Sequence, residues 1–217
     1  MIKLEKTEVM NFDGALRGMR NPLNSWDKSD SYEDDGEYVI GENDLKLAQK
    51  LIAAGTDHSK FMRQIFVCVD ITAPLFWYKE FDTYKVGTVA NSTSTMHTLT
   101  KHPITLDNFS FDVKLPKEHL EYAMCNMITI AHICEELRQK YLEYKDTESE
   151  LAKEYWRMLI EFLPNGWLQT RTVTLNYANL RNMYFSRRYH KLREWHTFCR
   201  WIENLPYGNG KGPWIAP

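Results

Sequence analysis

The sequence predicts an α+β fold in which helices surround a small sheet, and three observations support this. Residues 65–96 begin as an apolar strand, turn at Ala73-Pro74 and continue as an aromatic amphipathic segment. Residues 116–144 have the apolar periodicity of a long helix, and a polar link leads to residues 172–175, which precede two further helical segments. The chain has 217 residues, of which 43% are hydrophobic and 26% charged, so we expect one domain over residues 1–217.

Composition excludes several classes of protein. A formal net charge of −2 argues against a protein whose whole surface binds nucleic acid, so no nucleic-acid partner is expected. No apolar run approaches the roughly 20 residues that span a bilayer, and the charged first twenty residues do not resemble a signal peptide. The four cysteines, Cys68, Cys125, Cys134 and Cys199, have neither CxxC nor zinc spacing. They are typical of reduced thiols, so we expect a cytoplasmic protein without a metal site.

The N-terminal segment has a weak strand pattern over residues 1–10. Residues 11–26 then start polar and are broken at Asn21-Pro22. Arg17 and Arg20 are three residues apart, so a helical turn would place both on one face. This pair suits a phosphate ligand, but solvated surface arginines explain the spacing as well, and both interpretations remain open.

Residues 27–44 form the most acidic segment, with eight acidic residues against one Lys. The acids miss the spacing of a calcium-binding loop, and we expect a mobile acidic loop. Asn43 or Asp44 is expected to cap the next helix, which has an apolar face from residue 45 to residue 52 and ends at Gly55.

The long helix of residues 116–144 follows an irregular connection over residues 97–114. One stripe of this helix is apolar and contains Leu120, Met124, Met127, Ala131, Cys134, Leu137 and Tyr141. His132 and Glu136 form an i,i+4 pair on the same helix, but no further metal ligands are spaced to join them.

The C-terminal third continues mainly as helix. Thr147 and Glu150 have the spacing of a capping box for a helix that extends to about Phe162. Two more helices are expected over residues 177–187 and 189–205, and the Gly- and Pro-rich residues 206–217 form an irregular tail.

The strongest electrostatic feature is a basic segment at residues 165–201. It holds seven cationic residues against Glu194, namely Arg171, Arg181, Arg187, Arg188, Lys191, Arg193 and Arg200. Arginine forks suit phosphate or carboxylate, and the polar loop at residues 87–95 supplies the hydroxyl and amide groups of a phosphate cradle. Two other interpretations remain open: the arginines pair with the acidic loop or a sister subunit, and the loop is an ordinary connection. No spacing identifies a Ser-His-Asp, Cys-His or P-loop arrangement.

Several motifs taken together resemble the flavin-dependent thymidylate synthases. The family's Ala-Pro-hydrophobic-Phe step matches residues 73–76, and its Arg-His-Arg-x7-Ser-x-Arg signature falls without a gap on residues 83–95. The family's Leu-Pro-x-Gly and Thr-Arg steps resemble residues 163–166 and 170–171, allowing a one-residue slip. Family spacings also match at the following positions: Asn176, Leu180, Asn182 and Arg187. His58 resembles a family His, although Gln64 stands where that motif has its second His. The resemblance covers residues 44–205.

This resemblance implies helices around a small, mostly antiparallel sheet and a homotetramer with FAD at the subunit interfaces. It also implies reductive methylation of dUMP with methylenetetrahydrofolate as the one-carbon donor and NADPH as the reductant of the flavin. Because the family needs no enzyme nucleophile, the protein's task is orientation and electrostatics around the cofactor and nucleotide.

The family's functional residues fall on particular positions of this chain. The resemblance assigns a catalytic and substrate-binding role to Arg187. Further substrate-binding positions are Arg171, Asn91, Thr93 and Thr95. The cofactor-binding positions are His58, Thr83, Tyr84, Lys85, Asn176 and Asn182.

The signature itself is largely replaced. Thr83 and Tyr84 stand for an Arg and a His, and Thr95 stands for the Arg that grips the substrate phosphate. Each Arg-to-Thr change removes a charged hydrogen-bond donor, typically worth about 1.5–3 kcal/mol. One hypothesis is that Arg17, Arg20 or Arg188 compensates for the lost arginines.

Other functions remain open for the same sequence. They are flavin-dependent modification of another pyrimidine nucleotide, and nucleotide binding without catalysis. A single-strand-binding module is a further one, although helical spacing of the aromatics around residues 176–201 favours core positions.

Overall fold

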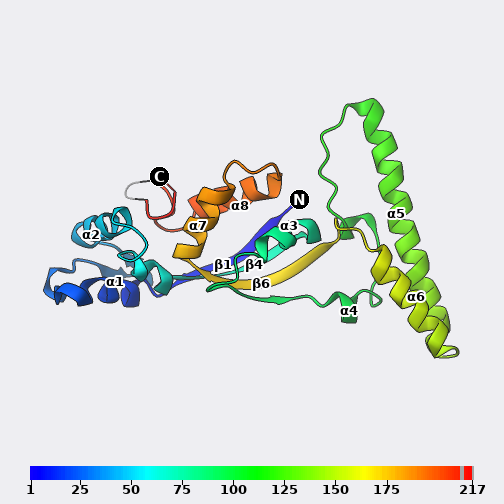
Figure 1. The fold of residues 1–217 in the computed structure, drawn as a ribbon, viewed down its shortest axis with the longest axis horizontal. Coiled ribbons are helices and arrows are strands. Elements are labelled where there is room, and N and C mark those ends of the chain that lie inside the picture. The colour runs from blue at the N-terminus through cyan, green and yellow to red at the C-terminus, as the bar shows by residue number, and fades with distance from the viewer. Residues whose placement is uncertain (211–212, 217) are drawn as a thin grey trace. The chain divides into compact units, whose positions relative to one another are not determined.

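The computed structural model describes residues 1–210 and 213–216. Its main sheet has four strands in the order β1-β4-β6-β5. Figure 1 labels β1, β4 and β6. The strands are β1 (Lys3–Met10), β4 (Phe66–Pro74), β5 (Val89–Ser92) and β6 (Leu168–Asn176). Alternate side chains of β4 are buried because a strand points successive residues to opposite faces, and the fully buried ones are Val67, Val69, Ile71 and Ala73.

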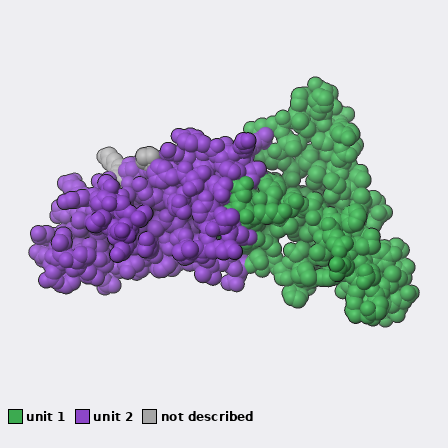
Figure 2. All heavy atoms as spheres, viewed as in Figure 1, with its two compact units in different colours: residues 1, 72–81, 92–171 green, residues 2–71, 82–91, 172–217 purple. Residues whose placement is uncertain are grey.

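The chain divides into two compact units, which Figure 2 colours separately. The first unit comprises residues 1, 72–81 and 92–171. The second comprises residues 2–71, 82–91 and 172–217. Strands β4 and β6 contribute residues to both units, and the expectation of one domain over the whole chain stays a prediction.

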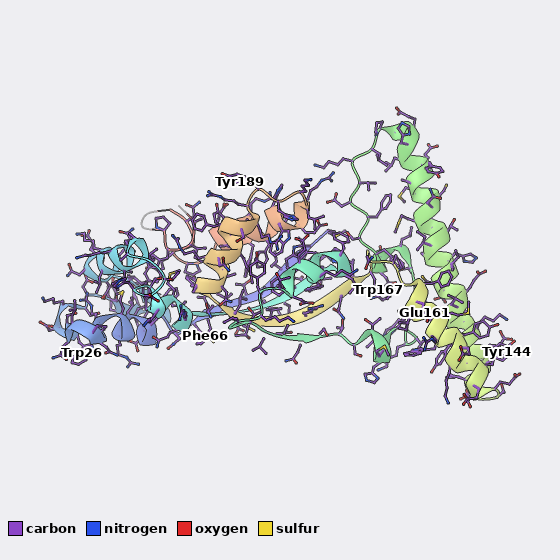
Figure 3. All side chains as sticks on the ribbon, in the orientation of Figure 1. Trp26, Phe66, Tyr144, Glu161, Trp167 and Tyr189 are labelled. Atoms are coloured by element: carbon purple, nitrogen blue, oxygen red, sulfur yellow. The ribbon has the colours of Figure 1, made fainter. Side chains whose placement is uncertain are left out.

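The first unit is dominated by two packed helices, α5 (Lys117–Tyr144) and α6 (Ser149–Phe162), which lie side by side (Figure 1). It also holds α3 (Leu75–Phe81), α4 (Thr95–Thr98) and the 3₁₀ turn η4 (Leu106–Asn108). Its core cluster consists of Leu99, Ile104, Phe109, Ala131, Cys134 and Leu159. Trp167 packs edge-on against Phe109 with ring centroids 5.4 Å apart, next to this cluster (Figure 3). The apolar stripe predicted for the long helix therefore packs as expected at Ala131 and Cys134.

The second unit contains α1 (Phe12–Arg20), α2 (Glu42–Ala53), α7 (Tyr177–Arg187) and α8 (Arg193–Glu203). Its 3₁₀ turns are η1 (Asn21–Leu23), η2 (Trp26–Lys28) and η3 (Lys60–Gln64). The core is aromatic: Phe12 contacts the rings of Tyr177, Tyr207 and Trp214 at centroid distances of 5.8, 5.8 and 6.0 Å.

The predicted irregular tail is non-helical but well packed where the structure describes it. Trp214 and Ile215 are fully buried, and the Trp214 N–H donates to the Tyr207 carbonyl at 2.8 Å. Residues 211, 212 and 217, which belong to the same predicted tail, lie outside the described residues.

The prediction of a mobile acidic loop at residues 27–44 is wrong. This segment contains an antiparallel hairpin formed by β2 (Tyr32–Asp34) and β3 (Glu37–Val39). The turn residues Asp35 and Gly36 have φ values of 46° and 81°, and two-residue hairpin turns favour this left-handed pair. The prediction overlooked this Asp-Gly turn signal because the segment is rich in acidic residues.

The capping predictions for two helices are also corrected. Gly41 is the N-cap residue of α2, and the Asp30 carboxylate accepts hydrogen bonds from the backbone N–H groups of Asn43 and Asp44, at 2.9 and 3.1 Å. The cap therefore comes from a residue distant in sequence. Helix α6 begins after Glu148, so Thr147 makes no capping box.

Other element boundaries shift by a few residues. Strand β6 begins at Leu168 and so includes part of the expected polar link, and α8 begins at Arg193 rather than at residue 189. The loop expected at residues 87–95 contains strand β5, which lies next to β6 in the sheet. The α7 boundaries agree with the prediction, and the α+β class is confirmed. Within the described chain, no helix has both the length and the apolar character to cross a bilayer.

Candidate functional site

Arg187, the last residue of α7, is held by two aromatic side chains. Its Nε–H donates to the Tyr84 hydroxyl at 2.9 Å. The guanidinium carbon lies 5.5 Å from the centroid of the Tyr84 ring and 5.0 Å from that of Trp195. Because Trp195 is fully buried in α8, it gives the planar guanidinium a rigid neighbour. The arrangement fixes the direction of a permanently charged donor fork.

The turn that contains Tyr84 is joined to the start of α7. The Asn176 side chain caps α7 by accepting from the Asn179 N–H at 3.0 Å, and the Asn179 amide donates to the Val86 carbonyl. Gly87 has φ 73°, and a Cβ there would lie 2.8 Å from the Asn176 Nδ2 atom. Only glycine combines this backbone conformation with so close an approach. The two features place the turn at residues 83–88 against the N-terminus of α7.

A second arginine site lies in the first unit. The Arg171 guanidinium carbon lies 3.7 Å from the centroid of the buried Tyr78 ring, and Arg171 Nε–H donates to Gln169 Oε1 at 3.0 Å. Gln169 in turn donates from Nε2 to the Thr93 carbonyl at 2.9 Å. Thr93 also pairs with Thr170, its N–H donating to the Thr170 carbonyl at 2.9 Å. The structure therefore links two predicted substrate-binding residues, Arg171 and Thr93, through one glutamine.

The remaining predicted site residues are placed as follows. Asn91 is exposed on β5, and the half-buried Thr95 begins α4. His58 is exposed in the turn that follows α2, and Asn182 is exposed on α7. Thr83 and Lys85 are exposed on the turn that follows α3. All of these side chains except that of Thr95 are therefore exposed to solvent in this chain.

The hypothesis that Arg17 and Arg20 together hold a phosphate is wrong. Arg20 is only 4% exposed, and its Nε–H donates to the fully buried Asp44 carboxylate at 2.6 Å. Arg17 pairs instead with Asp13 at 3.4 Å on the surface of α1. Arg20 is thus neither a surface arginine nor available to compensate for the altered signature, because a buried carboxylate already occupies its guanidinium.

Neither the histidine pair nor the cysteines form a metal-binding cluster. His132 Nε2 lies 3.3 Å from Glu136 Oε1 on the exposed side of α5. All four cysteines are free thiols, and burial raises the pKa values of Cys134 and Cys199. Among residues 1–210 and 213–216, no three His, Cys, Asp or Glu side chains gather as metal ligands would.

Sequence reasoning missed the residues that orient the two arginines. No sequence motif marks the residues that contact these arginines, which are Trp195, Tyr78 and Gln169. Tyr84 and Arg187 are 103 positions apart in the sequence, so their contact has no local signal. Only Gly87, a glycine in a polar loop after a helix, offered a local signal of close backbone approach.

Comparison with known proteins identifies the fold. No protein-family model matches the sequence, and no curated protein matches it. Two solved structures of the flavin-dependent thymidylate synthase ThyX from Helicobacter pylori, both with FAD and dUMP, align with TM-scores of 0.61 and 0.62. They are 18% and 17% identical to this chain, covering 94% and 96% of it and 94% and 95% of their own lengths.

A third solved structure has a different described activity. The UMP/dUMP methylase PolB from Streptomyces cacaoi, bound with 5-Br dUMP, aligns with a TM-score of 0.62 at 14% identity. The alignment covers 94% of this chain and 88% of PolB. The chain therefore has a flavin-dependent thymidylate synthase-like fold, and the family resemblance in the sequence is confirmed at the level of the fold.

The turn at residues 83–88 fits the polar part of a flavin nucleotide. The Thr88 hydroxyl is buried and has no hydrogen-bond partner among the described residues. A buried hydroxyl without a partner costs about 1–3 kcal/mol, which an acceptor atom on a bound cofactor would recover. The exposed Lys85 ammonium lies three residues away in sequence and suits a diphosphate.

Proposed function

We propose that this chain is a flavin-dependent enzyme that methylates dUMP at C5, with methylenetetrahydrofolate as one-carbon donor and NADPH as reductant. The observation that supports it best is the Arg187 guanidinium fixed by Tyr84 and Trp195, at a position matched by the family's nucleotide-binding Arg. The fold shared with dUMP-bound enzymes supports the same substrate class.

Arg187 is the proposed catalytic group because of its fixed charge. A pyrimidine that gains electron density at C5 develops negative charge on its ring carbonyl oxygens. A pre-oriented guanidinium beside such an oxygen stabilises that charge without reorganising during the reaction. Tyr84 and Trp195 supply this orientation, so in this chain we assign Tyr84 a positioning role in addition to its predicted contact with the cofactor.

The remaining substrate contacts are proposed for the first unit's arginine site and the adjoining polar residues. Arg171, held over Tyr78, and the hydroxyls of Thr93 and Thr95 would bind the nucleotide phosphate and sugar, together with Asn91. The Thr93 hydroxyl accepts the Thr170 N–H at 3.3 Å and still has its own proton to donate to a phosphate oxygen.

FAD, when bound, would supply the redox chemistry. The residues proposed to hold it are His58, Thr83, Tyr84, Lys85, Asn176 and Asn182. Because threonines replace two signature arginines at residues 83 and 95, we expect nucleotide or cofactor affinity to be lower than in enzymes that keep them.

A second candidate function is methylation of the ribonucleotide UMP or of another pyrimidine nucleotide. The specific observation in its favour is the fold shared with PolB, which is described as a UMP/dUMP methylase. A non-catalytic nucleotide-binding protein on the same scaffold is the third candidate, and the experiment below separates all three.

We also propose that the chain assembles as a homotetramer in the cytoplasm. Helix α5 exposes several large apolar side chains, which favours contact with another subunit: Tyr122 is 75% exposed, Ile128 50% and Ile133 38%.

The test uses the purified full-length chain. Bound FAD should colour it yellow, and NADPH should bleach the colour. Incubation with FAD, NADPH and isotopically labelled methylenetetrahydrofolate should then transfer label to dUMP, to UMP under the second candidate, or to neither if the protein only binds nucleotides.

The matched variant is Arg187→Gln, which keeps a polar side chain and removes the guanidinium charge. It should retain FAD and lose labelled product. A colourless protein that takes up no added FAD would contradict the proposal of a flavin enzyme. Product formation that Arg187→Gln leaves unchanged would remove Arg187 from the mechanism.

A further inference from the structure

A polar cavity lies in the second unit, on α7, α8 and the segment that joins them. Its volume is about 310 Å³. It is lined by Tyr184, Arg188, Tyr189, His196, Cys199, Arg200 and Glu203. None of these residues belongs to the arrangement of Arg187, Tyr84 and Trp195, so the cavity has its own chemistry.

The charge balance of this cavity is positive. Arg188 and Arg200 carry two positive charges, and Glu203 carries one negative charge and accepts the Tyr184 hydroxyl at 2.8 Å. Burial and the nearby Glu203 carboxylate raise the pKa of Cys199 to about 11, so this thiol stays neutral near pH 7. The cavity therefore attracts anions.

Arg188 has an unused donor at this site. Its Nε atom is buried without a hydrogen-bond partner among the described residues. Its guanidinium carbon lies 5.0 Å from the Phe185 ring centroid and 4.9 Å from that of Tyr189, so aromatic rings pack around it. Native structures seldom leave a buried donor unpaired, and an oxyanion would provide the missing acceptor.

Two further side chains define what the cavity can bind. His196 Nε2 lies 2.6 Å from the His190 carbonyl; a carbonyl only accepts, so Nε2 carries the proton, and the ring is held in one orientation. Tyr189 lies on the segment between α7 and α8 (Figure 3) and is 85% exposed. A ring this exposed at the rim of a cationic cavity can stack on a planar group of a ligand.

We propose that this cavity binds the phosphate of a small nucleotide, with Arg188 and Arg200 as the phosphate ligands and Tyr189 stacked on the base. The volume suits one phosphorylated small molecule better than a polymer. The site is independent of the proposed methylation of dUMP.

The experiment measures binding of two probes, inorganic pyrophosphate and ADP, to the full chain by calorimetry at fixed ionic strength. The protein is saturated with FAD and carries Arg171→Gln and Arg187→Gln, so the proposed cofactor and dUMP sites contribute little to the binding of either probe. In this background Arg188→Gln and Arg200→Gln should each weaken pyrophosphate binding about 10- to 100-fold, since each removes charge-assisted hydrogen bonds. Arg188→Lys keeps the charge but not the Nε donor. Its pyrophosphate affinity should therefore lie between that of the background protein and that of Arg188→Gln.

Lys191→Gln is the matched control, since it removes one charge from the same segment outside the cavity, and it should change binding less than about twofold. Tyr189→Ala should weaken ADP about fivefold or more and leave pyrophosphate unchanged. The proposal is overturned if neither probe binds, or if Lys191→Gln weakens binding as much as Arg188→Gln. It is also overturned if a single-stranded oligonucleotide binds far more tightly than ADP and Arg188→Gln leaves that binding unchanged.

Discussion

At the scale of single residues, the direction of one arginine fork depends on a tyrosine hydroxyl. The Arg187 Nε–H donates to Tyr84 at 2.9 Å, and the rings of Tyr84 and Trp195, with centroids 6.1 Å apart, enclose the guanidinium. Tyr84 occupies a signature position where the family has His. The replacement therefore keeps an aromatic ring with a polar atom, and this atom accepts a hydrogen bond from Arg187, the proposed catalytic residue.

Tyr84→Phe should weaken dUMP binding about tenfold while leaving thermal stability nearly unchanged. The ring keeps its packing, but the hydrogen bond to a charged group, worth about 1.5–3 kcal/mol in typical cases, is lost. Calorimetric titration with dUMP measures the effect, and Tyr122→Phe on the exposed face of α5 is the control. Equal affinity of the two variants would show that the hydroxyl does not orient Arg187.

At the scale of elements, a buried carboxylate ties α1, α2 and the segment before the hairpin together. Asp44 accepts Arg20 Nε–H at 2.6 Å and the hydroxyls of Ser29 and Ser31 at 2.7 and 2.6 Å. Burial by itself would raise the pKa of Asp44, but these hydrogen bonds outweigh burial and lower it. The buried carboxylate of Asp44, which belongs to the acidic segment, therefore holds this segment in place.

Arg20→Met should destabilise the protein by about 3–5 kcal/mol, because it leaves the buried Asp44 charge without its ionic partner. Arg17→Met removes an exposed pair with Asp13 on the same helix and should cost less than about 1 kcal/mol. Urea unfolding compares the two variants. A similar small loss in both would mean that the serine hydroxyls alone support Asp44.

In the helical pair α5 and α6, Glu135 makes stability depend on acidity. Two hydrogen bonds from Arg138, at 2.7 Å each, together with bonds from the Ile104 N–H and Gln139, lower the pKa of Glu135 from 4.5 to about 2. A depressed carboxyl pKa stabilises the fold above the unfolded-state value, and this contribution disappears as the pH falls through the folded-state value.

We therefore expect Glu135 to contribute about 2 kcal/mol of stability near neutral pH, after allowance for solvent screening, which is lost as the pH falls from 4.5 to about 2. Glu135→Gln should flatten the dependence of unfolding free energy on pH in this window. Glu118→Gln, which removes a charge near the start of the same helix, serves as the control. Identical pH profiles for Glu135→Gln and the unmodified chain would contradict this origin.

At the scale of the whole molecule, the proposed assembly makes a separate prediction. Light scattering after size exclusion should give the mass of four chains. Ile128→Lys places a charge among the exposed apolar residues of α5 and should dissociate the assembly, whereas Thr129→Lys at the neighbouring exposed position should perturb it less. A monomeric unmodified chain would contradict the tetramer.

The elements of the fold were predictable where the pattern is local. Helix α7 has the expected boundaries, and β1, β4 and the long helix lie where periodicity places them. Helix α6 ends as expected after Phe162, although it begins two residues after the predicted Thr147. The hairpin was missed because eight acidic charges suggested a solvated loop, whereas Asp30 and Asp44 find buried or backbone donors.

The candidate site was predictable in part. The resemblance selected Arg171, Arg187, Thr93 and Tyr84, and the structure joins them in two pairs, Arg187 with Tyr84 and Arg171 with Thr93. The role of each predicted residue in binding stays a prediction. Arg20 shows the opposite outcome: its spacing from Arg17 suggested an anion site, but its partner is Asp44, 24 residues away.

Periodicity and turn residues along the chain define most helices and strands, because these patterns depend on neighbours within one helix or strand. The type of α+β fold was predicted only from the resemblance of several motifs to the flavin-dependent thymidylate synthases. The partners of Arg20, Arg171 and Arg187, and the cavity around Arg188, are decided by the tertiary structure. A charged side chain has no preferred partner at a fixed sequence distance, so only the folded chain determines whether it meets a carboxylate, an aromatic face or an open cavity.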